Sequence, residues 1–198
     1  MVSLLSDLYP STLDKWATRQ DPPGYAVDDS GHVAVLNVAL QMNISSILPM
    51  VMYEICIGLH DLDEIFFSTG EYQIMDPDFR RRCILGYSRL QSEQRDILRY
   101  VRRAEGIEKC ETTLKCDSER LRWMGLALGK NDMNPLADDN RDSWNDFNCC
   151  SACRKTAKET YHVYRERLWD YLPTIFGFEN WDVLLGNRDS NTVAHCSS

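Results

Sequence analysis

The chain has 198 residues, of which 43% are hydrophobic and 26% charged, and its formal net charge is −8. This length and composition suffice for one domain or two small lobes with a hydrophobic core, which argues against a largely disordered chain. Because an acidic surface repels phosphate backbones and anionic lipid headgroups, we expect no membrane partner and disfavour nucleic acid.

The sequence carries no targeting signal that we recognise. No segment approaches the roughly 18–20 consecutive apolar residues of a membrane span. The N-terminus lacks a basic region, and Ser6 and Asp7 interrupt its apolar run, unlike a secretory signal. We therefore expect a cytoplasmic or nuclear protein. Because these compartments are reducing, we do not expect the eight cysteines to form a disulfide framework.

The N-terminal half has the apolar spacing of helices. Residues 32–43 and 47–57 are apolar nearly all round, as in buried helices. Pro49 lies in the first turn of the helix predicted over 47–57, where a missing N–H is tolerated. Helices are predicted over 3–18 (interrupted at Pro10), 32–43 and 47–57, with a turn-rich linker over 19–31.

A loop over 59–77, with a short helical turn at 62–67, is predicted to precede a long helix that ends near Arg103. This helix, over residues 79–103, carries the one basic stripe of an acidic chain. The stripe could form a groove for phosphate, nucleic acid or an acidic partner, but a solvated face is the favoured interpretation. Its members are Arg80, Arg81, Arg82, Arg89, Arg95, Arg99, Arg102 and Arg103.

The C-terminal half predicts a helix from Asp117 to Leu128, an irregular polar stretch over 129–148, and helices over 152–172 and 181–185. Aromatic residues near the last two are expected to pack together: Trp169, Tyr171, Phe176, Phe178 and Trp181. The expected fold is all-α, an irregular orthogonal bundle of about eight helices with a C-terminal half pinned by zinc. The predicted domains are an N-terminal helical lobe (1–104), a cysteine-containing helical lobe (105–186) and a disordered tail (187–198).

Four cysteines form two pairs whose spacing suggests a metal site. Cys110 and Cys116 are separated by five residues, Cys150 and Cys153 by two, and 33 residues lie between the pairs. Zinc prefers four soft or borderline ligands in a tetrahedron, and a C-x2-C turn brings two sulfurs to one point. Where such a turn opens a helix, the helix N-terminus favours the thiolate that zinc needs. We predict that a structural Zn²⁺ ion is bound by Cys110, Cys116, Cys150 and Cys153.

The remaining cysteines and the C-x-x-C spacing leave alternatives open. Cys56 and Cys83 lie on apolar helix faces and are expected to be inert buried thiols. Cys149 is ambiguous, because it could replace Cys150 as a ligand. The Cys150–Cys153 pair also has the form used by thiol-redox proteins, although that chemistry usually accompanies a βαβ pattern, which is not visible here.

No catalytic motif stands out in the sequence. The four histidines are scattered, and His162 is too far along its predicted helix to join the cysteines. We find no nucleophile–histidine–acid order, phosphate-binding glycine loop or His-Glu-x-x-His segment. A closed four-cysteine site also leaves no coordination position for chemistry. We therefore expect no enzymatic activity.

Several short motifs follow one another in an order that resembles a known family. They occupy residues 8–16 (LYPSTLDKW), 36–43 (LNVALQMN), 47–56 (ILPMVMYEIC), the two cysteine pairs, 168–173 (LWDYLP), 176–178 and Trp181. In this order they resemble the helical region that follows the BTB/POZ domain in basidiomycete fungal proteins. The resemblance covers most of residues 8–185.

This resemblance implies an interaction or adaptor protein, with the four cysteines at the family's cysteine positions. The strand-rich BTB fold is expected to be absent from this chain. The expected function is thus a non-enzymatic protein–protein interaction module with a structural zinc site, its protein partner and oligomeric state being left open. The alternatives are a thiol-redox protein and a phosphate or nucleic-acid binder acting through residues 79–103.

Overall fold

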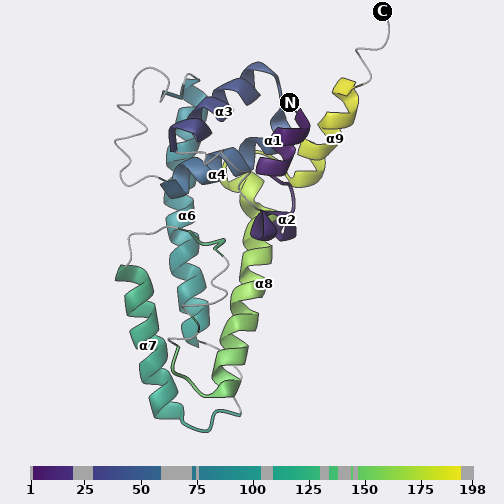
Figure 1. Cartoon of the computed structure of the whole chain (residues 1–198). Coiled ribbons are helices and arrows are strands. Elements are labelled where there is room, and N and C mark those ends of the chain that lie inside the picture. The colour runs from purple at the N-terminus through teal and green to yellow at the C-terminus, as the bar shows by residue number, and fades with distance from the viewer. Residues whose placement is uncertain are drawn as a thin grey trace, which may run out of the picture. The chain divides into compact units, whose positions relative to one another are not determined.

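The computed structural model describes residues 2–19, 29–58, 73–74, 76–103, 109–129, 134–137, 144 and 147–192. Within these ranges the chain forms eight α-helices, one short 3-10 helix and no strand (Figure 1), which confirms the predicted all-α fold. The elements are α1 (Val2–Leu8), α2 (Leu13–Thr18), α3 (Asp29–Gln41), η1 (Ser45–Ile47), α4 (Leu48–Gly58), α6 (Pro77–Arg103), α7 (Thr113–Gly129), α8 (Ser151–Ile175) and α9 (Trp181–Thr192). None of these helices has the length and apolar character needed to cross a membrane.

Most predicted helices are present, and the differences lie at their ends. The break at Pro10 separates α1 from α2, and α3 begins at Asp29, inside the predicted linker. Helix α7 begins at Thr113 rather than Asp117, because Thr112 accepts the first helical hydrogen bond from the Cys116 N–H. The predicted turn at 62–67 lies outside the described residues.

The chain divides into two compact units, each described here by itself. Unit 1 comprises residues 1–89 and 169–198, and unit 2 comprises residues 90–168. This division differs from the predicted lobes, because α6 and α8 are each divided between the two units. The predicted tail over 187–198 also differs, because α9 continues to Thr192.

Aromatic side chains form much of the core of unit 1, in which α3 packs on α4 and α9 packs against η1. Trp16 contacts both Tyr53 and Trp169, and Trp169 stacks on Trp181 with ring centroids 5.5 Å apart. The predicted packing of Trp169 with Trp181 is thus confirmed. Tyr171 departs from that prediction, because its side chain is 47% exposed.

One buried carboxylate connects α2 with α4 inside unit 1. Glu54 accepts a hydrogen bond from the Trp16 indole N–H at 3.0 Å and forms an ion pair with Arg19. The Arg19 guanidinium also lies over the Trp16 ring. Because an unpaired buried charge is strongly destabilising, this pairing allows a carboxylate to lie in the apolar face of α4.

Two arginines of the basic stripe bind the C-terminal end of α8 within unit 1. Gly177 adopts a left-handed φ of 77°, and the N–H of Phe178 donates back to the Pro173 carbonyl, which closes a glycine C-cap. Arg89 donates to the carbonyls of Thr174 and Ile175, and Arg82 donates to those of Phe176 and Gly177. A cation at this helix end is favoured because its last carbonyls carry partial negative charge.

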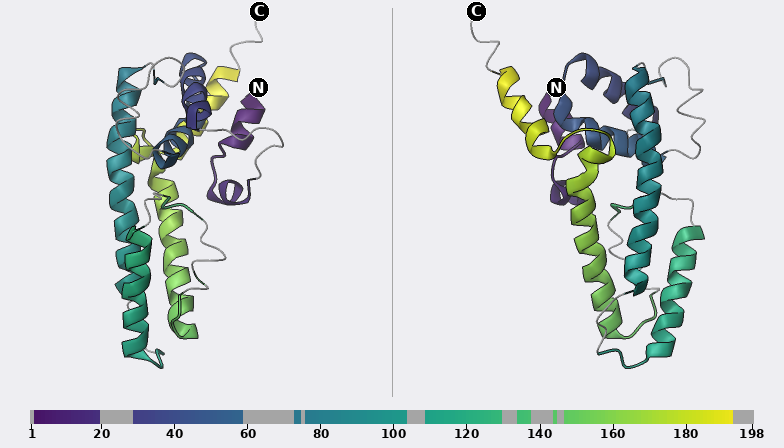
Figure 2. Two further views of the ribbon diagram at one scale, coloured as in Figure 1. Left: turned by 60° about the vertical axis from the view of Figure 1, so that its left-hand side comes forward. Right: turned by 180° about the vertical axis from the view of Figure 1, so that it is seen from behind.

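Unit 2 consists of three helical segments around one core: the part of α6 from Leu90 onward, α7, and α8 up to Leu168 (Figures 1 and 2). A stack of aromatic rings lies at one end of this core, with Trp123 on Trp144 at 5.2 Å and Phe147 edge-on to both. Three cysteines belong to the same buried cluster, namely Cys116, Cys149 and Cys153.

Two helical glycines provide a matched test of the packing. A Cβ added at Gly86 would lie 2.2 Å from Cε1 of Phe176, whereas one added at Gly125 would meet nothing within 4 Å. Gly86→Ala should therefore lower the free energy of unfolding by about 1–3 kcal/mol through overpacking. Gly125→Ala should raise it by up to about 1 kcal/mol through helix propensity. Urea denaturation of both variants checks this, and a stabilising Gly86→Ala would contradict the close approach.

Candidate metal centre

The first cysteine pair lies at the start of α7. Cys110 precedes the helix, Thr112 is its N-cap, and Cys116 falls in its first turn. A five-residue spacing between cysteines is compatible with a common site because the chain turns into the helix between them. Cys116 is fully buried, whereas Cys110 is partly exposed.

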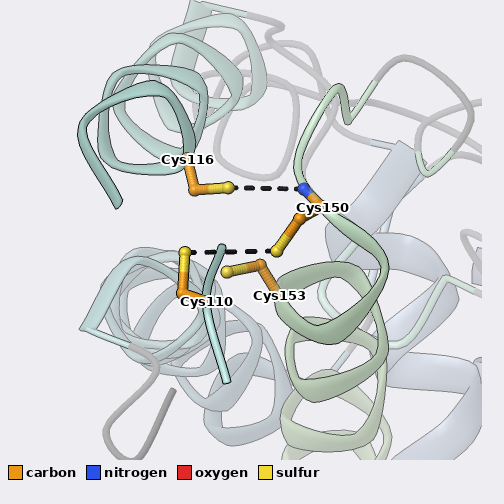
Figure 3. A group of neighbouring side chains, drawn as sticks. All are labelled: Cys110, Cys116, Cys150 and Cys153. Atoms are coloured by element: carbon orange, nitrogen blue, oxygen red, sulfur yellow. Dashed lines mark hydrogen bonds between the residues drawn. The ribbon is translucent and has the colours of Figure 1, made fainter. Parts of the chain in front are cut away.

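The second pair lies at the start of α8. Cys150 is the N-cap residue, whose carbonyl accepts the first helical hydrogen bond from Arg154 N–H at 3.0 Å. Cys153, three residues later, is fully buried, and its side chain points from the first turn into the space between the other three labelled cysteines (Figure 3). The predicted C-x2-C turn at a helix start is therefore present.

The four sulfurs converge on one point. Figure 3 shows the side chains of both pairs directed toward one another, and all four Sγ atoms lie within 4.8 Å of each other. The Sγ atoms of Cys110 and Cys150, from the two different segments, are 4.0 Å apart. Among the described residues this is the one group of histidine, cysteine and carboxylate side chains that could hold a metal ion, and no histidine belongs to it.

Hydrogen bonds favour the ionised form of two of these thiols. Burial acts to raise the pKa of Cys116, but hydrogen bonds from the Cys150 N–H (3.3 Å) and with the Thr112 hydroxyl (3.3 Å) outweigh it and lower the pKa to about 6. A hydrogen bond with the Cys153 backbone lowers the pKa of Cys150. Thiolates are the species that bind metal, so these contacts favour the ionisation state of Cys116 and Cys150 that a metal ion would need.

The other two thiols in this region behave differently. Burial, together with contacts to its neighbouring thiols, raises the pKa of Cys153. For Cys149, burial and the nearby Cys116 raise the pKa to about 12, and its Sγ lies 3.5 Å from the Cys116 carbonyl oxygen. Cys149 is outside the group of converging sulfurs, so the geometry selects Cys150 rather than Cys149.

Arg120 supplies a buried positive charge next to the cluster. Its side chain is 7% exposed, its Nη1 lies 3.5 Å from the Cys153 Sγ, and its Nη2 pairs with Asp117. Burial acts to lower the pKa of Arg120, but Asp117 and Cys153 outweigh it and raise the pKa. A divalent ion with four thiolates carries a net charge of −2, which this guanidinium would partly offset.

Sequence reasoning found the four converging cysteines but missed Arg120 and Thr112. Both follow from helical spacing once α7 is known to begin at Thr113, because Thr112 and Arg120 lie four residues before and after Cys116 and share its face. The signal was present in the sequence, but the later predicted helix start at Asp117 concealed it.

Comparisons with protein-family models, curated proteins and solved structures found no match. The functional argument therefore depends on the geometry of the chain itself.

Replacing the buried cation should weaken metal binding specifically. We expect Arg120→Met to reduce zinc affinity about 10–100-fold, the usual range for groups that contact a metal ligand. Arg165→Met is the matched control, because Arg165 is equally buried in unit 2 but donates to the Leu136 carbonyl. Competition with a chromophoric chelator measures both affinities. Equal zinc affinities in the two variants would contradict a specific role for Arg120.

Proposed function

We propose that the chain is a non-enzymatic protein–protein interaction module whose second unit is stabilised by a structural zinc ion. The ligands in this proposal are Cys110, Cys116, Cys150 and Cys153. The single observation that carries it is the convergence of their four sulfurs from two remote segments.

The choice of zinc follows from the donor set and its dimensions. An all-sulfur, four-ligand set is typical of structural zinc, with zinc–sulfur bonds of about 2.3 Å. A tetrahedron of such bonds needs sulfurs roughly 3.5–4 Å apart. The 4.0 Å separation of the Cys110 and Cys150 sulfurs suits that requirement, and the remaining pairs, within 4.8 Å, need only small side-chain rotations.

A structural role follows from how the ligands are arranged. Four protein ligands complete the coordination of zinc and leave no position for a substrate. The ion would join the start of α7 to the start of α8, where Cys110 and Cys150 also pack against the hydrophobic core of unit 2. Zinc binding energy would then be part of the folding energy of this unit.

Metal content and protease resistance test the zinc site together. Purified protein should contain about one zinc per chain. The Cys153→Ser variant should contain no zinc, melt at a lower temperature and be cleaved by protease within unit 2. A strong chelator added to the unmodified protein should have the same three effects. Cys149→Ser should retain the zinc, because Cys149 lies outside the sulfur group. Unchanged zinc content and melting in Cys153→Ser would contradict the proposal.

The interaction surface that we infer lies on the outer side of α7. Leu114 is 86% exposed and Leu121 is 47% exposed, and their seven-residue separation places both on one helix face. Two small exposed residues, Ser118 and Gly125, continue this face. An apolar segment of a partner protein could pack along it, and the resemblance to the region after BTB/POZ domains supports an adaptor role.

Site-specific photocrosslinking tests this surface. A photoreactive amino acid at Leu114 should give one discrete crosslinked protein in cells, and adding Leu121→Glu should abolish that product. The control position is Glu166, whose side chain is 57% exposed on α8 and lies about four turns from the helix start that meets α7. The same pattern of products from both positions would contradict a partner site on α7.

The two alternative functions receive less support from the described contacts. Of the basic stripe, Arg82 and Arg89 already bind backbone carbonyls, and Arg99 pairs with Asp96. Thiol-redox chemistry at Cys150 and Cys153 would leave the convergence of Cys110 and Cys116 on the same point without a purpose. A purified chain with no metal and one rapidly reacting thiol would favour the redox function instead.

A further inference from the structure

We propose that Cys110 and Cys150 form an oxidation site, at which hydrogen peroxide converts the two thiolates to a disulfide and so releases the metal. This inference rests on the proposed zinc centre and adds a means of regulating it. The C-x-x-C pair, Cys150 with Cys153, is not the pair that we expect to form.

Exposure divides the four cysteines into two classes. Cys116 and Cys153 are 0% exposed, whereas Cys110 and Cys150 are partly exposed. The exposed pair includes one sulfur from each segment, and these two sulfurs are 4.0 Å apart. A dissolved oxidant therefore reaches one ligand from each side of the centre before it reaches either buried ligand.

Burial and close neighbours also restrict access to the other two sulfurs. The Cys116 Sγ accepts from the Cys150 N–H and lies 3.3 Å from the Thr112 hydroxyl, and the Cys153 Sγ lies 3.5 Å from the Arg120 guanidinium. Cys150 has hydrogen-bond partners as well, so exposure rather than hydrogen bonding separates the two classes. Because Cys110 and Cys150 are the partly exposed residues, attack on a peroxide begins at one of them.

The reaction balances with the peroxide as the sole oxidant. One thiolate attacks the O–O bond, forms a sulfenic acid and expels hydroxide. The second thiolate attacks that sulfur, which forms the S–S bond and expels another hydroxide. The two sulfurs together lose two electrons, and the peroxide becomes two molecules of water after taking up two protons. The metal keeps its charge of +2, and Cys116 and Cys153 each gain a proton as it leaves.

The identity of the pair determines what oxidation does to unit 2. A disulfide between Cys150 and Cys153 would join two residues of one helix turn and leave the Cys110 segment free. A disulfide between Cys110 and Cys150 instead connects the same two segments that the metal connected. Oxidation would therefore release the metal while the start of α7 remains attached to the start of α8.

Tryptic mapping distinguishes the two disulfides directly. Cleavage after Lys109 and Lys115 places Cys110 on a six-residue peptide, 110–115, whereas cleavage after Arg141 and Arg154 places Cys149, Cys150 and Cys153 together on 142–154. Zinc-loaded full-length protein is treated with hydrogen peroxide, followed with a chromogenic zinc chelator, then alkylated and digested without reductant. The Cys149→Ser variant, treated in parallel, excludes Cys149, and fragmentation of the cross-linked peptides between Cys150 and Cys153 assigns the sulfur within 142–154; a bond from Cys110 to Cys153 would contradict the proposed pair.

We expect one zinc released for each disulfide formed, a cross-linked product of peptides 110–115 and 142–154 in both proteins, and recovery of zinc binding after dithiothreitol. A disulfide within 142–154 as the main product, or zinc loss without a disulfide, would overturn this inference. Neither result would contradict the proposed zinc centre. A purified chain that contains no zinc before peroxide is added would overturn the proposed function, and the release of metal with it.

Discussion

Four sulfur atoms meet at one point in unit 2, and they come from two segments with 33 residues between Cys116 and Cys150. Each segment leads into a helix, and both helices contribute residues to one buried core. The chain between α7 and α8 is rich in polar residues, but its described residues Leu136, Trp144 and Phe147 are buried. A metal ion at the sulfurs would join the start of α7 to the start of α8, in addition to the restraint that these buried side chains provide.

The electrostatics around the sulfurs suit this arrangement. Helix N-termini favour negative charge, and Cys150 and Cys153 occupy the N-cap and the first turn of α8. Backbone and side-chain donors favour the thiolate of Cys116, and Arg120 provides a buried cation next to the Cys153 sulfur. These contacts favour thiolates, which a metal ion would require. The core residue Cys56 differs, because its burial and its contact with Cys83, whose carbonyl oxygen lies 3.5 Å from the Cys56 Sγ, raise its pKa.

The sequence was sufficient for features that depend on local spacing. The all-α fold, the helix from Pro77 to Arg103 and the four converging cysteines all follow from periodicity, from Pro and Gly positions, and from the two cysteine spacings. Apart from the two cysteine pairs, which the need of zinc for four ligands connects, contacts between remote residues could not be predicted. The division into units joins residues 1–89 with 169–198, and it places the boundaries inside two long helices that show no break in the sequence. Likewise, nothing local indicates that Arg82 and Arg89 bind the carbonyls at the end of α8.

X-ray absorption at the zinc edge of the purified, full-length protein tests the central claim most directly. The account predicts one zinc per chain surrounded by four sulfur atoms at about 2.3 Å, with no nitrogen or oxygen in the first shell. A first shell with two or fewer sulfurs, or a protein that binds no zinc while its fold is intact, would contradict it.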